Sequence, residues 1–115
     1  MRLLPRLMSA MMLATLSATA GAAPVKILGF DDMSCVAWNA SKNDAEVRAQ
    51  QIAWVRGFLS GHNYARQSEQ VSVVSAGTVE TFVNRHCGEK TRSTLAEAAQ
   101  RMSDQYSGRN AAITK

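Results

Sequence analysis

Hydrophobic residues recur at intervals of three and four through most of the chain after residue 44, the spacing that places them on one face of an α-helix. The longest periodic segment follows a polar break at residues 41–44. Asn43 is a suitable N-cap there, and Glu46 three positions later completes a capping-box-like pattern. We therefore predict a long central helix that begins after Asn43 and ends between Tyr64 and Gln67.

This central helix is predicted to have one wide apolar face, with Arg48, Gln50 and Arg56 pointing away from it. The apolar face combines two neighbouring stripes, which consist of Ile52, Val55, Leu59 and His62 and of Trp54, Phe58 and Gly61. A face of this width is typical of the helix at the centre of a small bundle.

Two glycines, Gly57 and Gly61, lie inside the same helix and are spaced by four from Ala53. A glycine in a helix interior costs about 0.8–1 kcal/mol relative to alanine. Close approach of another backbone segment is the usual compensation, so we predict that Gly57 and Gly61 are close-packing positions. In the alternative interpretation Gly61 ends the helix, and residues 62–64 begin a loop.

Shorter elements are predicted on the N-terminal side of the central helix. Residues 24–33 form an arm that is either extended along the domain or disordered, because Gly29 interrupts its apolar residues. Residues 34–38 predict a short helical turn capped by Ser34 or Asp32. Cys35 and Trp38 are three positions apart and therefore share one face of this turn.

Two further helices are predicted on the C-terminal side. Residues 71–74 are a β-branched run suited to an extended connector, and Ser75 caps a helix over residues 76–86 that Gly88 terminates. Thr94 and Glu97 form a capping box for a last helix, which Gly108 closes before a frayed tail over residues 109–115. The predicted buried face of the helix over residues 76–86 consists of Val79, Phe82, Val83 and His86. That of the last helix consists of Leu95, Ala98, Ala99, Met102 and Tyr106.

The first 22 residues have the pattern of a secretory signal peptide, and residues 23–115 are predicted to form one domain. Arg2 and Arg6 give a basic start, an apolar run follows, and small residues close the segment. The apolar run is too short to span a bilayer, which takes about 20 residues. We expect cleavage near residues 22–23, with residue 20 as a second position and an uncleaved N-terminal anchor as the alternative. The predicted location is the periplasm, without membrane attachment after cleavage.

Cys35 and Cys87 are the two cysteines of the chain, and two cysteines in an exported protein predict one disulfide. The bond would tie the first short helix to the end of the third helical segment. A CxxC redox motif is absent, and the two cysteines and two histidines have no common zinc spacing. The predicted fold class is therefore all-α: a small disulfide-stapled bundle of about four helices around one long central helix.

Charge gives little support to a nucleic-acid partner. Two of the 13 Lys and Arg lie in the signal segment, so eleven remain against nine Asp and Glu, a net charge of about +2. The basic side chains are scattered among acidic ones without a basic run. The sequence predicts no nucleic-acid binding and no cofactor or metal.

None of the catalytic motifs considered has its full set of residues in this sequence. His86 is adjacent to Cys87, but a Cys–His pair needs a free thiol, which the predicted disulfide removes. Asp31 and Asp32 have no second carboxylate cluster as a partner, and the serines lack a GxSxG context. The chain also has no phosphate-binding loop. We expect a protein that is not an enzyme.

Aromatic side chains are the residues most open to a binding role. The candidates for contact with clients or a partner protein are Trp38, Trp54, Phe58 and Tyr64, with His62 beside them. Aromatic residues are the usual anchors of protein interfaces. The alternative is that both tryptophans belong to the core.

Three segments resemble the HdeA/HdeB family of periplasmic acid-stress chaperones. Residues 33–35 are similar to the context of the early cysteine, residues 53–55 to the tryptophan of the central helix, and residues 79–87 with 94–95 to the second cysteine and following helix. The resemblance covers roughly residues 33–102.

The resemblance implies a homodimer at neutral pH that opens in acid and holds unfolding client proteins on exposed apolar surface. Below pH 3 the nine carboxylates would be neutral, and the mature chain would carry a charge of about +14. Few acidic residues are present to drive such a switch. The pattern Trp-x-x-Gly-Phe-Leu-x-Gly departs from that family and resembles immunity proteins of the Rap/Tai type, which implies inhibition of one toxic enzyme as the alternative.

Overall fold

The computed structural model describes residues 24–108, which contain four α-helices and no β-strand. The helices are α1 (Cys35–Ala40), α2 (Ala45–Ala65), α3 (Ala76–Glu89) and α4 (Leu95–Tyr106). The all-α class and the long central helix are therefore confirmed. The predicted signal peptide, residues 1–22, and the predicted frayed tail, residues 109–115, lie outside the described residues.

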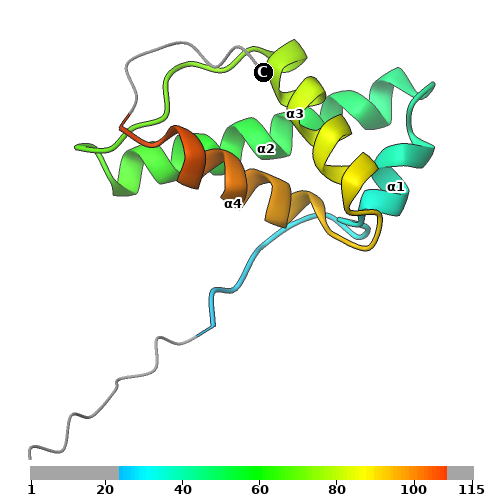
Figure 1. Ribbon diagram of the computed structural model, residues 1–115, viewed down its shortest axis with the longest axis horizontal. Helices are drawn as coiled ribbons and strands as arrows, with labels where there is room; N and C mark the ends of the chain where they lie inside the picture. The colour runs from blue at the N-terminus through cyan, green and yellow to red at the C-terminus, as the bar shows by residue number, and fades with distance from the viewer. Residues whose placement is uncertain (1–23, 109–115) are drawn as a thin grey trace, which may run out of the picture.

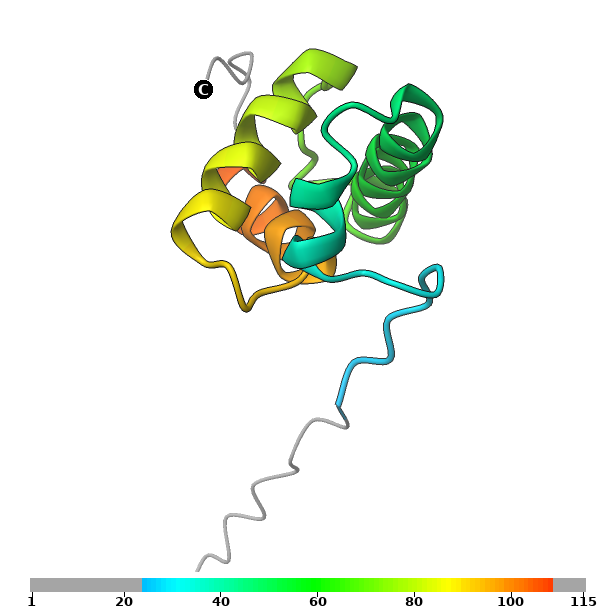
Figure 2. The ribbon, with the colours of Figure 1, turned by 90° about the vertical axis from the view of Figure 1, so that its right-hand side faces the viewer.

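The helices form one bundle in which α2 and α3 both pack on α4 and on each other, while α1 packs on α3 (Figure 1). Seen along α2, the short helix α1 lies between α2 and α3, and the arm of residues 24–33 bends beneath α2 before it leaves the bundle (Figure 2). None of the helices in residues 24–108 is long and apolar enough to cross a membrane.

The core is built from the predicted helix faces and from the connector before α3. Trp38, Val55, Val79 and Val83 are fully buried at its centre. The connector also behaves as predicted, because Val71 and Val74 are buried while Val73 between them faces solvent. The rest of the buried apolar set is Cys35, Ile52, Leu59, Cys87, Leu95, Ala98, Ala99 and Met102.

Side-chain caps fix where the helices begin. Of the two predicted caps of α1, Ser34 is the N-cap, because its Oγ accepts a hydrogen bond from Ala37 N at 3.0 Å, while Asp32 Oδ1 accepts one from Ser34 N at 3.0 Å. The predicted cap of α2 is wrong by one residue. Asp44, not Asn43, accepts from Val47 N at 3.1 Å. A carboxylate at this position also interacts favourably with the helix dipole.

The third and fourth helices begin as predicted, at Ser75 and Thr94, but α3 ends later than predicted. It continues through Gly88 to Glu89, so Gly88 lies in its last turn. Gly108 does follow α4 in the left-handed region with φ 73°, and its N–H donates to Gln70 O at 3.0 Å. This bond ties the end of α4 to the connector that precedes α3.

A cross-link and a short backbone pairing hold the two ends of the domain together. The predicted disulfide between Cys35 and Cys87 is present and joins α1 to α3. Next to it, Ser34 and Thr94 form an isolated antiparallel bridge, in which Cys35 N donates to Ser93 O at 2.9 Å and Leu95 N donates to Met33 O at 2.7 Å. We call residues 32–35 and 93–97 together the clamp.

The predicted close packing at Gly57 and Gly61 is wrong, and Gly61 does not end α2. Both glycines are exposed, and an ideal Cβ at either would meet nothing within 4 Å. The helix packs through Ile52, Val55 and Leu59, and the two glycines fall on the opposite, solvent side.

Gly57→Ala should therefore stabilise the fold, by about 0.5–1 kcal/mol, because the helix propensity improves and no neighbour has to move. Urea unfolding followed by circular dichroism measures the change. Gly108→Ala is the matched control, and it should destabilise the protein because its φ of 73° disfavours a side chain. Loss of stability in Gly57→Ala would contradict the open surroundings of this position.

Candidate functional site

The predicted binding residues lie in three different environments. Trp38 is fully buried in the core, so its assignment to a binding surface is wrong. Its indole N–H donates to Asn84 Oδ1 at 2.9 Å. Tyr64 lies at the end of α2 with 83% of its surface exposed. Trp54 and Phe58, one helical turn apart, are half-buried and pack against the edge of the core.

Trp54 and Phe58 form the aromatic surface of α2. Their rings stack with centroids 5.7 Å apart and an angle of 28° between the planes. The Trp54 indole N–H donates to Leu28 O at 2.9 Å, which places the arm against this surface. The bond is exposed to solvent, so it positions the arm beside the rings without burying it.

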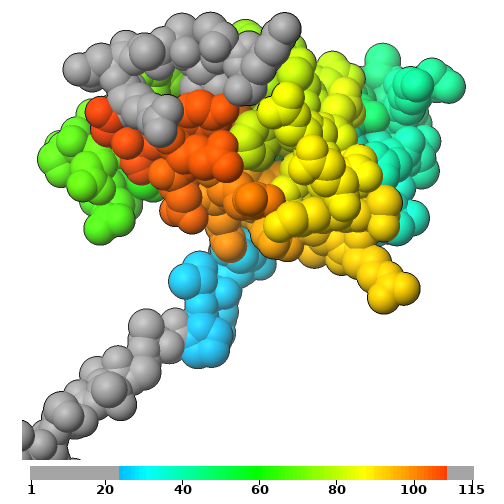
Figure 3. All heavy atoms as spheres, in the orientation of Figure 1, coloured from blue at the N-terminus to red at the C-terminus, as the bar shows by residue number. Residues whose placement is uncertain are grey.

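The contact between the predicted arm and Trp54 is the part of the site that sequence reasoning missed. Val25 and Leu28 are 80% and 88% exposed, and Phe30 is also at the surface, so the arm presents apolar side chains to solvent. It extends from the helical body beside the clamp (Figure 3). An arm with this composition was visible in the sequence, but its contact with Trp54 depends on tertiary structure.

A second group of side chains of the types that act in catalysis, a histidine, a serine and a glutamate, lies where α3 meets α4. His86 is buried, and its Nε2 lies 2.7 Å from Ser93 Oγ, which in turn donates to Glu97 Oε2 at 2.5 Å. A serine hydroxyl has one hydrogen, and here Glu97 receives it. His86 Nε2 is therefore the donor to Ser93.

The direction of these hydrogen bonds differs from that in a nucleophilic serine site. A histidine base must accept the serine proton and be oriented by a carboxylate on its other nitrogen. Here the carboxylate binds the serine, and the histidine donates to it. The three side chains instead link the end of α3 to the first turn of α4. They also change the predicted capping box, because the Glu97 carboxylate binds Ser93 rather than the backbone of Thr94.

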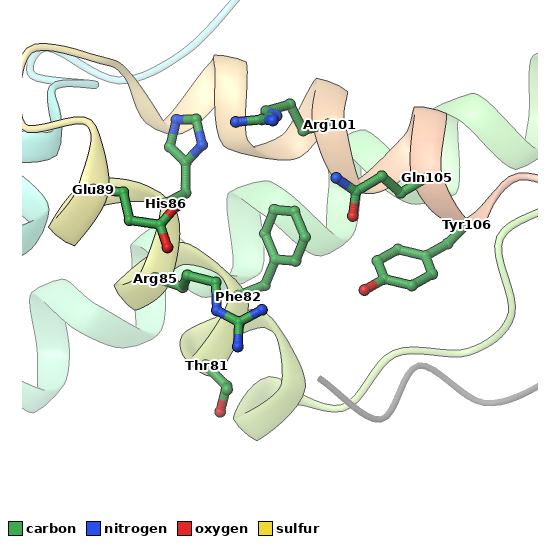
Figure 4. Close-up of a pocket in the computed structure, with 8 residues that line it drawn as sticks. All are labelled: Thr81, Phe82, Arg85, His86, Glu89, Arg101, Gln105 and Tyr106. Carbon is green, nitrogen blue, oxygen red and sulfur yellow. The ribbon is translucent and has the colours of Figure 1, made fainter.

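A shallow pocket of about 130 Å³ lies next to His86 between α3 and α4 (Figure 4). Phe82 lies in the middle of the view, and Arg85 and Arg101 approach from opposite helices. The Phe82 ring meets Tyr106 edge to face, with centroids 6.1 Å apart. Two arginines and one glutamate, Glu89, give this pocket a positive balance. The described residues contain no group of three His, Cys, Asp or Glu side chains suited to a metal ion.

Three groups of the clamp region have shifted pKa values. Burial lowers the pKa of His86, with Glu97 opposing the shift and Arg101 and Lys90 adding to it. The Ser93 hydroxyl lowers the pKa of Glu97, and hydrogen bonds from Ser34 lower the pKa of Asp32. Each shift makes folding less favourable in acid, because the unfolded chain binds the proton more readily.

The lowered pKa of His86 predicts how the free energy of unfolding depends on pH. The unfolded histidine binds a proton as the pH falls below about 6.5, while the folded one stays neutral, so stability decreases from there down to the folded pKa. Proton NMR should give a His86 pKa below 6.5, and His86→Gln should flatten the unfolding free energy against pH in this window. A His86 pKa at or above 6.5 would contradict the prediction.

Comparison with known proteins gives no relative, since no family model, no curated protein and no solved structure matches this chain. The structure by itself establishes the class: a mostly helical, disulfide-bonded domain with an aromatic surface that is hydrogen-bonded to its own N-terminal arm.

Proposed function

We propose that this chain is an exported, HdeA/HdeB-like stress protein that binds unfolding client proteins through apolar surface. The observation that carries the proposal is the half-buried aromatic surface of Trp54 and Phe58, to which the apolar arm is joined by the bond from the Trp54 indole to Leu28 O. Release of the arm would free the Trp54 indole and join these rings to the apolar side chains that the arm already presents to solvent. An exposed apolar patch of this kind is suited to unfolded chains.

Acid is the proposed trigger, because the acid-sensitive groups gather at the root of the arm. The Asp32 carboxylate accepts a hydrogen bond from Ser34 N. Glu97 and His86 both bond to the Ser93 hydroxyl, and the Ser93 carbonyl accepts a hydrogen bond from Cys35 N. Protonation of Asp32 and Glu97 and charging of His86 weaken both sides of the clamp. The disulfide next to the clamp would keep the opened chain compact.

A client-protection assay tests this function. At pH 2–3 the protein should bind an apolar dye more strongly than at pH 7 and should suppress aggregation of an unrelated acid-unfolded enzyme. Trp54→Ala should lose most of this protection, whereas Thr81→Ala, an exposed change on α3, should keep it. Dye binding and protection that stay the same between pH 7 and pH 2 would reject the proposal.

The same experiment separates the immunity-type alternative. Such a protein would bind one enzyme tightly at neutral pH and would not protect unrelated clients in acid. The homodimer that the family resemblance implies is tested by sedimentation at both pH values, where a dimer at pH 7 and monomer at pH 2–3 is the expected result.

A further inference from the structure

Arg48 is a buried charge whose hydrogen-bonding capacity is only partly used. It was predicted to point away from the apolar face of α2, and this prediction is wrong, because 7% of its surface is exposed. Its guanidinium carbon lies 3.6 Å from the centroid of the Trp38 ring, and Nη2 donates to Trp38 O at 2.9 Å. Stacking on an aromatic face is a favourable position for a guanidinium, and this explains why the side chain turns inward.

Two nitrogens of this guanidinium, Nε and Nη1, are buried without a hydrogen-bond partner. Within residues 24–108, Arg48 is the one side chain with such nitrogens. The nearest carboxylate oxygen, Glu80 Oε1, is 3.9 Å from Nε, which is close enough for charge attraction but too far for a hydrogen bond. A buried donor without an acceptor is costly, so a native structure that retains one calls for an explanation.

Arg48 lines an open cleft of about 420 Å³ between the α1–α2 turn and α3. Lys42 adds a second positive charge, and Glu80 contributes one negative charge, so the cleft carries a net charge of +1. Asn84 uses its Oδ1 to accept the indole N–H of Trp38, because an indole donates only. The Nδ2 donors of Asn84 therefore remain available to a molecule in the cleft.

We propose that this cleft binds a carboxylate, held by Arg48 and Lys42 with amide donors from Asn43 and Asn84. A single negative charge matches the net charge of the cleft, and planar carboxylates are the anions that guanidinium groups bind with geometric specificity. The carboxylate displaces the Glu80 side chain, which is 44% exposed and makes no hydrogen bond to Arg48, and takes its place as the acceptor for Arg48. The ligand is a free small carboxylate or an acidic group of a partner protein, which share this chemistry.

The two tryptophans of the chain provide a site-specific measurement. The Trp38 indole contacts both Arg48 and Asn84, whereas the Trp54 indole is bonded to Leu28 on the arm. Titration with sodium acetate at pH 7, against sodium chloride at equal ionic strength, should shift the ¹H–¹⁵N signal of the Trp38 indole and leave that of Trp54 in place. Equal shifts of both indoles, or no shift beyond chloride, would overturn the proposal.

Replacing Arg48 would remove its core contact with Trp38, so a loss of binding in such a variant would not be separable from a loss of folding. Charge variants at the rim of the cleft avoid this problem. Glu80→Gln should bind acetate about fivefold more tightly and Lys42→Gln about fivefold more weakly, which is about the factor for one charge roughly 4 Å from the ligand in water. Lys90→Gln, outside the cleft, is the matched control and should bind as the unmodified protein does. If Arg48 were only a structural partner of Glu80, Glu80→Gln would lose stability without gaining affinity.

A second titration distinguishes the two sources of carboxylate. A short peptide with one glutamate and blocked ends is compared with its glutamine counterpart and with acetate. Tighter binding of the glutamate peptide than of acetate identifies a protein ligand, and equal binding identifies a small carboxylate. Equal binding of the glutamate and glutamine peptides, together with no effect of acetate, would overturn the proposal.

Discussion

Replacing both cysteines, Cys35→Ala with Cys87→Ala, should lower the free energy of unfolding by about 4 kcal/mol. The bond closes a loop between residues 52 apart in sequence, and a loop of this length removes much of the conformational entropy of the unfolded chain. Since small domains have a total stability of about 5–15 kcal/mol, the loss is a large fraction of it. Urea unfolding of the oxidised protein and the double variant, followed by circular dichroism, measures the difference.

Reduction provides the control for this result. Dithiothreitol should destabilise the unmodified protein by a similar amount and leave the double variant unchanged. A loss below 1 kcal/mol would show that the clamp and the core hold the two ends together without the cross-link. In that case the disulfide would also not limit expansion of the acid-opened chain.

Trp38→Ala should destabilise the protein by about 3–5 kcal/mol, the range for removal of a large aromatic side chain from a core. Trp38 is fully buried, and its loss also removes the aromatic face beneath Arg48 and the donor to Asn84. Thermal and urea unfolding measure the change. The effect should be on folding, with client protection lost only to the extent that folded protein is lost.

Trp54→Ala is the matched variant, since it removes the same side chain from the half-buried aromatic surface of α2. Its stability loss should be smaller, because Trp54 lies at the edge of the core. Its effect on client protection should be larger than its effect on folding. If the two tryptophans instead cost the same stability, the arm and Trp54 would belong to the core, and the proposed binding surface would be wrong.

Two regions of the molecule serve distinct purposes in these proposals. The clamp contains Asp32 and Glu97, and His86 bonds to its Ser93; the shifted pKa values of all three groups reduce stability in acid. The Arg48 cleft depends on a guanidinium that remains charged across the whole pH range. Acid should therefore open the arm, and a carboxylate should bind the cleft while the ligand remains ionised.

The sequence was sufficient for the features that depend on neighbouring residues. Helix caps at Ser34, Ser75 and Thr94 are local, since each side chain bonds a backbone N–H three positions ahead. The periodic apolar residues of α2 to α4 identified most of the core for a similar reason. The disulfide followed from two cysteines in a chain predicted to be exported.

Tertiary structure decided the positions of side chains that have more than one favourable environment. Arg48 looked like a solvent-facing charge by helical position, but the Trp38 ring and carbonyl provide it with a buried partner. Gly57 and Gly61 looked like packing positions, yet no segment approaches them. The arm over Trp54 and the hydrogen bonds of His86 with Ser93 and Glu97 also join residues from different elements. Helical periodicity fixes which residues share a face, whereas the packing of the other elements determines which face is covered and which polar groups meet there.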